Sequence, residues 1–418
     1  MMRRRTAVVT GCGVVSPLGC RVAEFWDALV AGRSALAPIV GFDTGAAANA
    51  VAAEVTGFRP EAHLDANEIS RYDRVSQFAL AAARQALGEA DLDLDRVDRT
   101  RIGVILATTL GGIPIGEEYQ RALAAGTPFA ARRLLQVPYY AVAARLARAL
   151  EVRGPVVSPS IACASGTHAV GLALELIRAG HADRFVVGGA ETLSPFVVHG
   201  FNCLRATTAD TVRPFDARRR GLLLGEGAAV LVVEDAERAA ERGGRTLAEV
   251  AGTGLAGDAS HITAPARDGA GAARAMRAAL ADAGVEPAAV DFISAHGTGT
   301  PYNDAMEIAA IAAVFGAGAA RVPVNSIKGA IGHTLGAAGS FEAIMAAQIL
   351  SEGIIPPTVN CEELDPACPL DVVRGTARRH DVRTVLSTSS AFAGNNAAIV
   401  LRRCSRGQAA ISAADMRL

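Results

Sequence analysis

Short runs of β-branched residues alternate with alanine-rich stretches along most of the chain, and this alternation restricts the fold more than any other feature. The strand candidates include residues 6–10 (TAVVT), 102–107 (IGVILA) and 290–295 (VDFISA). Alanine-rich helix candidates, such as 77–89 and 270–283, lie between strands of this kind. Strands that alternate with helices predict an α/β protein with largely buried sheets.

Two of the predicted strands end in similar turns of small residues. The sequence VVTGCG occupies residues 8–13, and ISAHGTG occupies residues 293–299. Each turn is followed by proline and then by a helical stretch. This similarity predicts an internal duplication, with one half at 1–245 and the other at 246–418.

The composition excludes several classes of function. A net charge of -1 leaves no positive excess for nucleic acid as a general partner. The seven cysteines are irregularly spaced, which favours neither a disulfide framework nor a zinc site and indicates a reducing cytoplasm. No apolar run reaches the roughly 20 residues that span a bilayer. The N-terminal apolar stretch is broken by glycines and Pro17, so we expect a strand and a tight turn there rather than a signal peptide.

Cys163 lies at a predicted strand-to-helix corner, in SPSIACASGTHAVGLALELIRAG. Ser165 is a candidate N-cap of the helix that follows. Free backbone N–H groups and the helix dipole at such a corner favour a thiolate over a thiol. Cys163 is therefore a candidate nucleophile. The alternative is a small buried cysteine without a chemical role.

A second predicted strand delivers His296 into the glycine-rich turn of AHGTGTPYND. A histidine at the carboxyl end of a strand faces the crevice in which α/β proteins bind ligands. The alternative is a histidine that only satisfies the backbone of the turn. Asp304 and Glu307 have the D-x-x-E spacing of a helix cap, which favours a structural role for both.

Lys328 is the only lysine of the chain, because every other positively charged side chain is an arginine. A site that needs a compact ammonium could not accept the wider guanidinium, so this lysine is expected to be buried or catalytic. Chance retention is the alternative. His333 follows in GHTLGAAGS, where glycines permit close approach of the backbone. Residues five apart are not neighbours on a helix, so a loop is the expected setting.

A loop of small residues in LSTSSAFAGNNAAIVL places Phe392 before the last predicted strand. Backbone N–H groups of this loop could stabilise an oxyanion. An ordinary turn is the simpler interpretation.

Together these segments resemble the β-ketoacyl-acyl carrier protein synthases, the condensing enzymes of fatty acid and polyketide assembly. The resemblance runs from RRRTAVVTGCGVVSPLG to NNAAIVLRR. The resemblance rests on four segments, which are in chain order ACASGTH, RPFDARRRGLLLGEGAAVLVVE, AHGTGTPYND and NSIKGAIGHTLGAAG. The resemblance implies a thiolase-like fold, in which two pseudo-duplicated α/β halves form a five-layer αβαβα sandwich and the subunits pair as a dimer.

The resemblance also implies the reaction, a decarboxylative Claisen condensation of an acyl thioester with malonyl-acyl carrier protein. Cys163 would carry the acyl chain as a thioester. His296 and His333 would stabilise the enolate that is left after loss of CO2. Lys328 would support them electrostatically, paired with Glu307, which would change the capping interpretation of that acid.

Further implications concern the oxyanion hole and the partners. The amides of Cys163 and Phe392 would form the acyl oxyanion hole. Arg71 and Arg205 match positions that meet the acidic carrier protein. The substrates would be carried on its phosphopantetheine, without a metal or a redox cofactor. The second subunit would be an identical chain or a ketosynthase-like chain-length partner.

The chain departs from the resemblance in one loop, where the family commonly shows SFGFGGTN and this chain has SSAFAGNN. Ser390 replaces an aromatic residue, Ala391 and Ala393 replace glycines, Gly394 is kept, and Asn395 replaces threonine. Alanine is unfavourable at positive φ, so this loop is expected to follow a different backbone path at the mouth of the acyl pocket. The departure favours a specialised polyketide or polyene pathway over housekeeping fatty acid elongation.

Three other functions compete with this interpretation. A non-condensing chain-length partner shares the fold but lacks the nucleophilic cysteine, which Cys163 argues against. A thiolase uses a second cysteine as base, and neither His296 nor His333 has a cysteine near it in the sequence. A Cys-His hydrolase would not explain a second histidine and a lysine.

Overall fold

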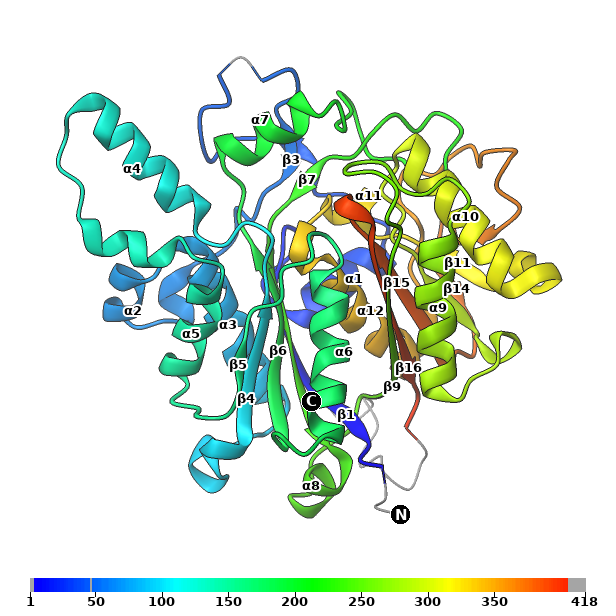
Figure 1. Cartoon of the computed structure of the whole chain (residues 1–418), viewed down its shortest axis with the longest axis horizontal. Coiled ribbons are helices and arrows are strands. Elements are labelled where there is room, and N and C mark those ends of the chain that lie inside the picture. The colour runs from blue at the N-terminus through cyan, green and yellow to red at the C-terminus, as the bar shows by residue number, and fades with distance from the viewer. Residues whose placement is uncertain (1–3, 46, 405–418) are drawn as a thin grey trace.

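The computed structural model describes residues 4–45 and 47–404 as a mixed α/β protein, shown in Figure 1. The helices are α1 (Val22–Val30), α2 (Ala66–Arg71), α3 (Arg74–Glu89), α4 (Ile113–Ala125), α5 (Tyr140–Ala149), α6 (Ser165–Arg178), α7 (Pro195–Cys203), α8 (Ala236–Glu241), α9 (Ala270–Ala283), α10 (Pro301–Phe315), α11 (Lys328–Ile331) and α12 (Ala338–Glu352).

Most strands belong to one large twisted sheet. Its strands are β1 (Ala7–Val15), β4 (Ile102–Ala107), β5 (Val156–Val157), β6 (Arg184–Glu191), β8 (Gly227–Asp235), β9 (Ala248–Gly257), β10 (Phe292–Ser294), β11 (Pro323–Asn325), β13 (Asp371–Val372), β15 (Thr384–Ser390) and β16 (Asn395–Arg402). Two small sheets hold β2 (Ala37–Pro38), β3 (Val51–Ala53) and β7 (Leu224–Gly225), and β12 (Ile354–Ile355) with β14 (Arg378–Arg379).

The large sheet repeats one pattern of strand pairing on both sides of the β1–β9 pair. One side continues β1-β8-β6-β4-β5, and the other continues β9-β16-β15-β10-β11 and then adds β13 at its edge. On each side the first two pairings are antiparallel and the next two are parallel. This repeated topology confirms the expected fold of two pseudo-duplicated α/β halves.

Helices complete five layers. α3 and α5 pack on the outer face of the first half-sheet, and α9 and α10 pack on the outer face of the second. α6 and α12 form the middle layer and contact strands of both halves, and Figure 1 shows α6 between β6 and β9. α12 is buried on nearly every side, as the middle of three helical layers requires.

The two turns that were predicted to be equivalent are not equivalent. Residues 8–13 lie inside β1, which continues through both glycines to Val15 before the chain turns. The counterpart of β1 is β9, which carries its own glycine pair. The glycines lie inside the strand because a helix crosses it there at short range.

Glycine makes these two helix crossings possible. A Cβ at Gly11 would lie 2.1 Å from the carbonyl oxygen of Ala86, and one at Gly13 would lie 1.9 Å from that of Ala82. In the second half, a Cβ at Gly254 would lie 2.2 Å from the carbonyl oxygen of Ala275. α3 and α9 therefore pack backbone to backbone on matching strands.

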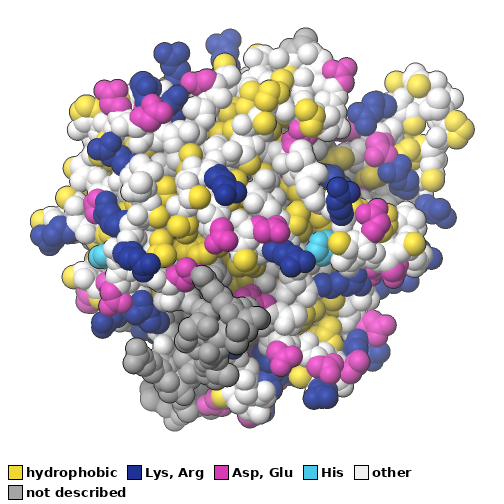
Figure 2. Space-filling model, turned by 180° about the vertical axis from the view of Figure 1, so that it is seen from behind, with side chains coloured by type: hydrophobic (Ala, Val, Ile, Leu, Met, Phe, Trp, Pro, Cys, Tyr) yellow, Lys and Arg dark blue, Asp and Glu magenta, His cyan; other side chains and the backbone are white. Residues whose placement is uncertain are grey.

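The surface charge and the helix lengths test the expectations drawn from composition. Positive and negative side chains are interspersed on the face in Figure 2, in keeping with the net charge of -1. Among the residues that the structure describes, no helix has both the length and the apolar character of a membrane span.

The helix crossing leads to a stability prediction. Gly13→Ala places a methyl group where the carbonyl of Ala82 lies, so α3 must move, and we expect a loss of about 2 to 4 kcal/mol of unfolding free energy. Denaturant unfolding would measure this loss.

Gly88→Ala is the matched control, because Gly88 lies in α3 and a Cβ there meets nothing within 4 Å. This control should gain up to about 1 kcal/mol from helix propensity. Equal stability of Gly13→Ala and the parent protein would contradict the backbone-to-backbone packing.

Candidate active site

A cleft of about 300 Å³ opens where strands of both halves end. It is lined by Cys163, His296 and His333, and by Phe392 and residues of the loops around them. The cysteine comes from the first half and the histidines from the second. The cleft therefore brings together four of the sequence candidates, Cys163, His296, His333 and Phe392.

Cys163 lies in a strained corner immediately before α6. The preceding residue, Ala162, has φ 52°, a left-handed conformation that is unusual for a residue with a Cβ. Ser165 holds the corner, because its hydroxyl accepts from the amide of Ile161 (2.8 Å) and donates to the carbonyl of Ala162 (2.6 Å). The prediction that Ser165 caps the helix is wrong by one position, because the N-cap is Ala164 and makes no side-chain cap.

The ionisation of Cys163 differs from the sequence expectation. Burial raises the pKa of the Cys163 thiol to about 12, although the positive charge of Lys328 acts to lower it. The expected resting thiolate is therefore wrong. A resting thiolate would place a charge in apolar surroundings, which favour the neutral thiol. The proton must therefore leave as the sulfur attacks.

His296 and His333 form a close pair of neutral imidazoles. Their ring centroids lie 5.2 Å apart, with the planes at 82°. Burial lowers the pKa of each histidine well below its usual value, and Lys328 lowers it further. Among the described residues, neither Nδ1 atom has a hydrogen-bond partner. Each ring can therefore donate one proton to a bound group or accept one.

Backbone contacts fix both histidines. The His333 amide donates to the carbonyl of Leu223 (2.7 Å), and its carbonyl accepts from the amide of Gly225 (3.0 Å). The His296 amide donates to Glu307. The two rings are thus held by the edge of β7 and by α10.

Glu307 anchors the turn that carries His296. Its carboxylate accepts from the amides of His296 (2.6 Å) and Gly297 (2.8 Å) and from the hydroxyl of Thr388 (3.0 Å). Burial raises the pKa of Glu307 to about 7, and the backbone donors oppose that rise. The predicted pairing of Glu307 with Lys328 is wrong, because the ammonium of Lys328 forms its ion pair with Glu342 instead.

The predicted D-x-x-E cap is also wrong. The side chain of Thr300 caps α10 by accepting from the amide of Asn303. Asp304 accepts from the amide of Gly299 (3.1 Å), the residue before the N-cap, and from the amide of Phe215 in another loop (2.8 Å). Both acids therefore tie loops to the site instead of capping their own helix.

Lys328 is buried, as its isolation in the sequence predicted, and its partner is Glu342. The ammonium lies 2.6 Å from the carboxylate, and both side chains are at most 2% exposed. Lys328 begins the short helix α11, so the expected loop setting holds only for His333.

Glu342 extends the pair to the nucleophile helix. Its second oxygen accepts from Ser389 (3.4 Å), which hydrogen-bonds Thr167 of α6 (2.7 Å). Glu342 was not among the site residues predicted from the sequence. The signal was present, because Glu342 is the one acid within the apolar run 341–350.

Glu191 is a second buried acid that the sequence analysis missed. It ends β6, and burial raises its pKa to about 7. It accepts from the amides of Thr109, Leu110 (3.3 Å) and Gly336 (3.1 Å). It therefore joins the loop after β4 to the turn that follows His333. An acid at the end of an apolar strand was the available signal.

The small-residue loop lies at the cleft. The ring of Phe392 stacks on Phe201, with centroids 5.9 Å apart. Ala393 has φ 63°, so the expectation that alanine avoids positive φ is wrong there, whereas Ala391 is extended at φ -137°. The Ala393 amide donates to the carbonyl of Ile262 (2.7 Å), which helps to hold the strained conformation.

Neighbouring side chains tie this loop down further. Asn396 donates to the carbonyl of Gly394 (3.1 Å) and to Asp258 (2.8 Å), and Ser390 donates to Asn396 (2.8 Å). Ser390, which stands where the family commonly has an aromatic residue, therefore belongs to this network.

The two candidate carrier-protein arginines lie in different settings. Arg205 is exposed and lines the cleft. Arg71 is the last residue of α2, is exposed, and is not among the residues that line the cleft.

Comparisons with known proteins agree with this geometry. The model of the beta-ketoacyl synthase N-terminal domain matches residues 4–239, and that of the C-terminal domain matches residues 247–362. The chain is similar to 3-oxoacyl-[acyl-carrier-protein] synthase 2 of Coxiella burnetii, with 38% identity over 96% of this chain and 99% of the relative.

Solved structures are similar over the same length. The ishigamide ketosynthase/chain length factor has 42% identity and a TM-score of 0.92, over 96% of this chain and all of that chain. A type II polyketide synthase acyl-carrier protein in complex with its ketosynthase bound to the hexaketide has 30% identity and a TM-score of 0.87, over 96% of this chain and 100% of that chain. The family matches and these relatives show that this chain belongs to the β-ketoacyl synthase family.

Proposed function

We propose that this protein is a β-ketoacyl-acyl carrier protein synthase that condenses an acyl thioester with malonyl-acyl carrier protein and releases CO2. The observation that carries the proposal is one cleft that holds Cys163 beside two neutral imidazoles, over a buried Lys328–Glu342 pair. A hydrolase needs only one of the two histidines.

The first half-reaction loads the acyl chain. The Cys163 sulfur attacks the thioester carbonyl, its proton passes to a neutral imidazole, and the carrier thiol leaves with a proton. The amides of Cys163 and Phe392 are the proposed oxyanion donors for this step.

The second half-reaction forms the carbon–carbon bond. When CO2 leaves the malonyl thioester, the electrons of the broken carbon–carbon bond stay with the thioester and form an enolate. The enolate oxygen accepts hydrogen bonds from His296 and His333. The enolate carbon attacks the acyl carbonyl on Cys163, the carbon–sulfur bond breaks, and the leaving thiolate takes up one proton from solvent. Lys328 keeps the imidazoles neutral, so that they act as hydrogen-bond donors.

The partners follow from the same reaction. The acyl groups would arrive on the phosphopantetheine of an acyl carrier protein, with Arg71 and Arg205 as contacts, and the chain would pair with an identical subunit or a chain-length partner. The proposed halves are 1–245 and 246–418, and the proposed compartment is the cytoplasm. The similarity to the ishigamide ketosynthase and the small-residue loop at 390–396 favour a polyketide or polyene pathway over fatty acid elongation.

The loading step gives the direct test of this proposal. Mixing the protein with acyl-carrier protein thioesters should add the mass of one acyl group, and Cys163→Ala should abolish the gain. Intact-protein mass spectrometry would measure it, with Cys203→Ala, an exposed cysteine on α7, as the matched control. Acylation that survives in Cys163→Ala would refute the assignment.

The buried pair predicts a separable effect on stability and catalysis. Lys328→Met leaves Glu342 buried without its partner, so we expect a loss of about 3 kcal/mol of unfolding free energy and a roughly 100-fold fall in condensation rate. The double variant Lys328→Met with Glu342→Leu should regain most of the stability but not the rate.

Denaturant unfolding and product formation would measure the two effects. Recovery of activity together with stability in the double variant would show that Lys328 only holds the fold.

The raised pKa of Cys163 predicts its pH dependence. The thiol is protonated below its pKa, so alkylation of Cys163 by iodoacetamide should accelerate roughly tenfold per pH unit from about pH 7 to about pH 9.5. Peptide mass spectrometry would follow Cys163 with exposed Cys203 as the internal reference. A rate that levels off below about pH 8 would indicate a resting thiolate and contradict the burial argument.

A further inference from the structure

Two arginines are the only charged residues among those that line the catalytic cleft. Arg205 and Arg220 are both exposed and both belong to its lining, and no aspartate or glutamate of the described residues does. Within the described part of the chain, neither guanidinium has an ion pair or a side-chain hydrogen bond. The cleft that leads to Cys163 thus carries positive charge without compensation.

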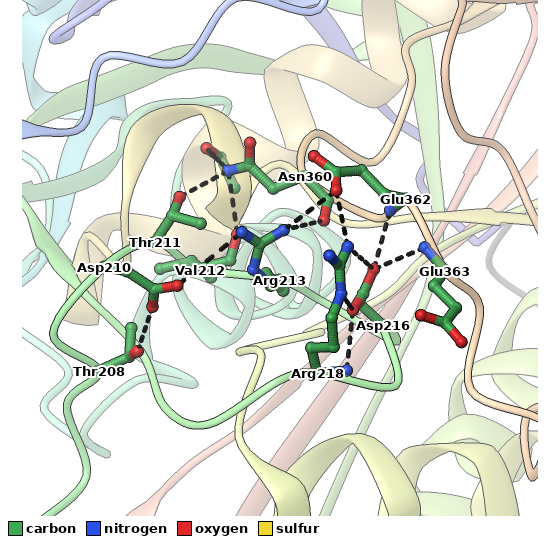
Figure 3. A network of polar contacts seen from close by, with 11 residues as sticks. Thr208, Asp210, Thr211, Val212, Arg213, Asp216, Arg218, Asn360, Glu362 and Glu363 are labelled. Carbon is green, nitrogen blue, oxygen red and sulfur yellow. Dashed lines mark hydrogen bonds and ion pairs between the residues drawn. The ribbon is translucent and has the colours of Figure 1, made fainter.

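The arginines next to Arg220 contrast with it, as Figure 3 shows for two of them. Arg218 lies 3.2 Å from Asp216 and 2.7 Å from Glu362. The ion pairs of the other two are Arg213 with Asp210 and Glu362, and Arg219 with Asp365 and Asp304. Three arginines of one loop are therefore neutralised, and the fourth, Arg220, is left facing the cleft.

The same network holds the loop in place. Asp216 is fully buried and accepts from the amides of Glu362 and Glu363 (both 2.8 Å), which ties this loop to the segment after Asn360. The position of Arg220 is thus set by a rigid neighbour, and its guanidinium remains free to bind.

Backbone pairing ties together the two segments that carry the unpaired arginines. Thr207 and Leu222 form a parallel bridge, in which the Leu222 amide donates to the carbonyl of Ala206 (2.9 Å). Arg205 and Arg220 each lie two residues before a member of this bridge. Both guanidinium groups therefore belong to one cleft without an acid in its lining, and an uncompensated positive cleft attracts anions.

The end of α7 fixes the backbone of Arg205. Arg205 follows the C-cap Leu204, and its φ of 53° is the left-handed conformation that commonly ends a helix. The Ala206 amide donates to the carbonyl of Phe201 (3.3 Å) and the Arg205 amide to that of Asn202 (3.0 Å), so this helix end holds Arg205 at the cleft.

We infer that Arg205 and Arg220 form an anion clamp for the phosphodiester of the phosphopantetheine arm, an inference that rests on the proposed function. Guanidinium groups bind phosphate oxygens through paired, charge-assisted hydrogen bonds. The thioester end of the arm must reach Cys163 through this cleft, and the phosphodiester is the one anion that the arm itself carries. Arg220 thereby acquires a binding role, and the proposed contact of Arg205 with the carrier protein is made to its phosphopantetheine arm.

Protection of Cys163 from alkylation tests the clamp without requiring turnover. Free 4′-phosphopantetheine should protect Cys163 from iodoacetamide at a roughly tenfold lower concentration than pantetheine, which lacks the phosphate. Arg220→Gln and Arg205→Gln should each reduce this difference, and the double variant should abolish it. Inorganic phosphate should weaken the protection by phosphopantetheine in the parent protein only.

Arg96→Gln is the matched control, because this side chain is 85% exposed and precedes the start of β4, at the opposite end of the sheet from the cleft. It should leave the phosphate preference unchanged. Equal protection by the two compounds in the parent protein would overturn the clamp.

Malonyl transfer separates the two claims. An effect of the double variant on the KM for malonyl-carrier protein, with an unchanged KM for malonyl-phosphopantetheine, would place the arginines on the carrier-protein surface and would also overturn the clamp. A parent protein that prefers phosphopantetheine but condenses no malonyl thioester would keep the clamp and refute the proposed function.

Discussion

The buried pair of Lys328 and Glu342 is the interaction on which the active site depends. Two charges taken out of water are expensive, and they persist only where their geometry and hydrogen bonds compensate. Here the carboxylate reaches Ser389 and, through it, Thr167 of the nucleophile helix. The pair therefore couples α11, α12, β15 and α6 at one point.

The positive charge of Lys328 also acts on the protonation of the catalytic groups. Lys328 acts to lower the pKa of Cys163 and of both histidines, while burial keeps the thiol neutral. Neutral imidazoles can donate to an enolate oxygen and also take the proton of a thiol. A compact ammonium is needed because the space is enclosed, which explains why this position kept the lysine that the rest of the chain replaced with arginine.

The sequence predicted the α/β class, the meeting of Cys163 with His296 and His333, and the burial of Lys328. These features depend on local pattern and on one exceptional residue. The acid Glu342 stood out within its apolar run, but its pairing with Lys328 could not be predicted, because the contact joins α11 to α12 through the tertiary fold. The glycines of β1 resembled a turn because a glycine needed for close helix packing looks the same in sequence as one needed for positive φ. Ala393 shows the converse, since tertiary hydrogen bonds hold an alanine in a conformation that its chemistry disfavours.

If one cleft couples decarboxylation to carbon–carbon bond formation, the free carboxyl carbon of the malonyl group must leave as CO2. The carbon balance would be measured with an acylated carrier protein and with malonyl-carrier protein labelled in that carbon. Labelled CO2 and unlabelled β-ketoacyl-carrier protein should form in equal amounts. Release of free fatty acid with the label still on the malonyl group would identify a hydrolase and contradict this coupling.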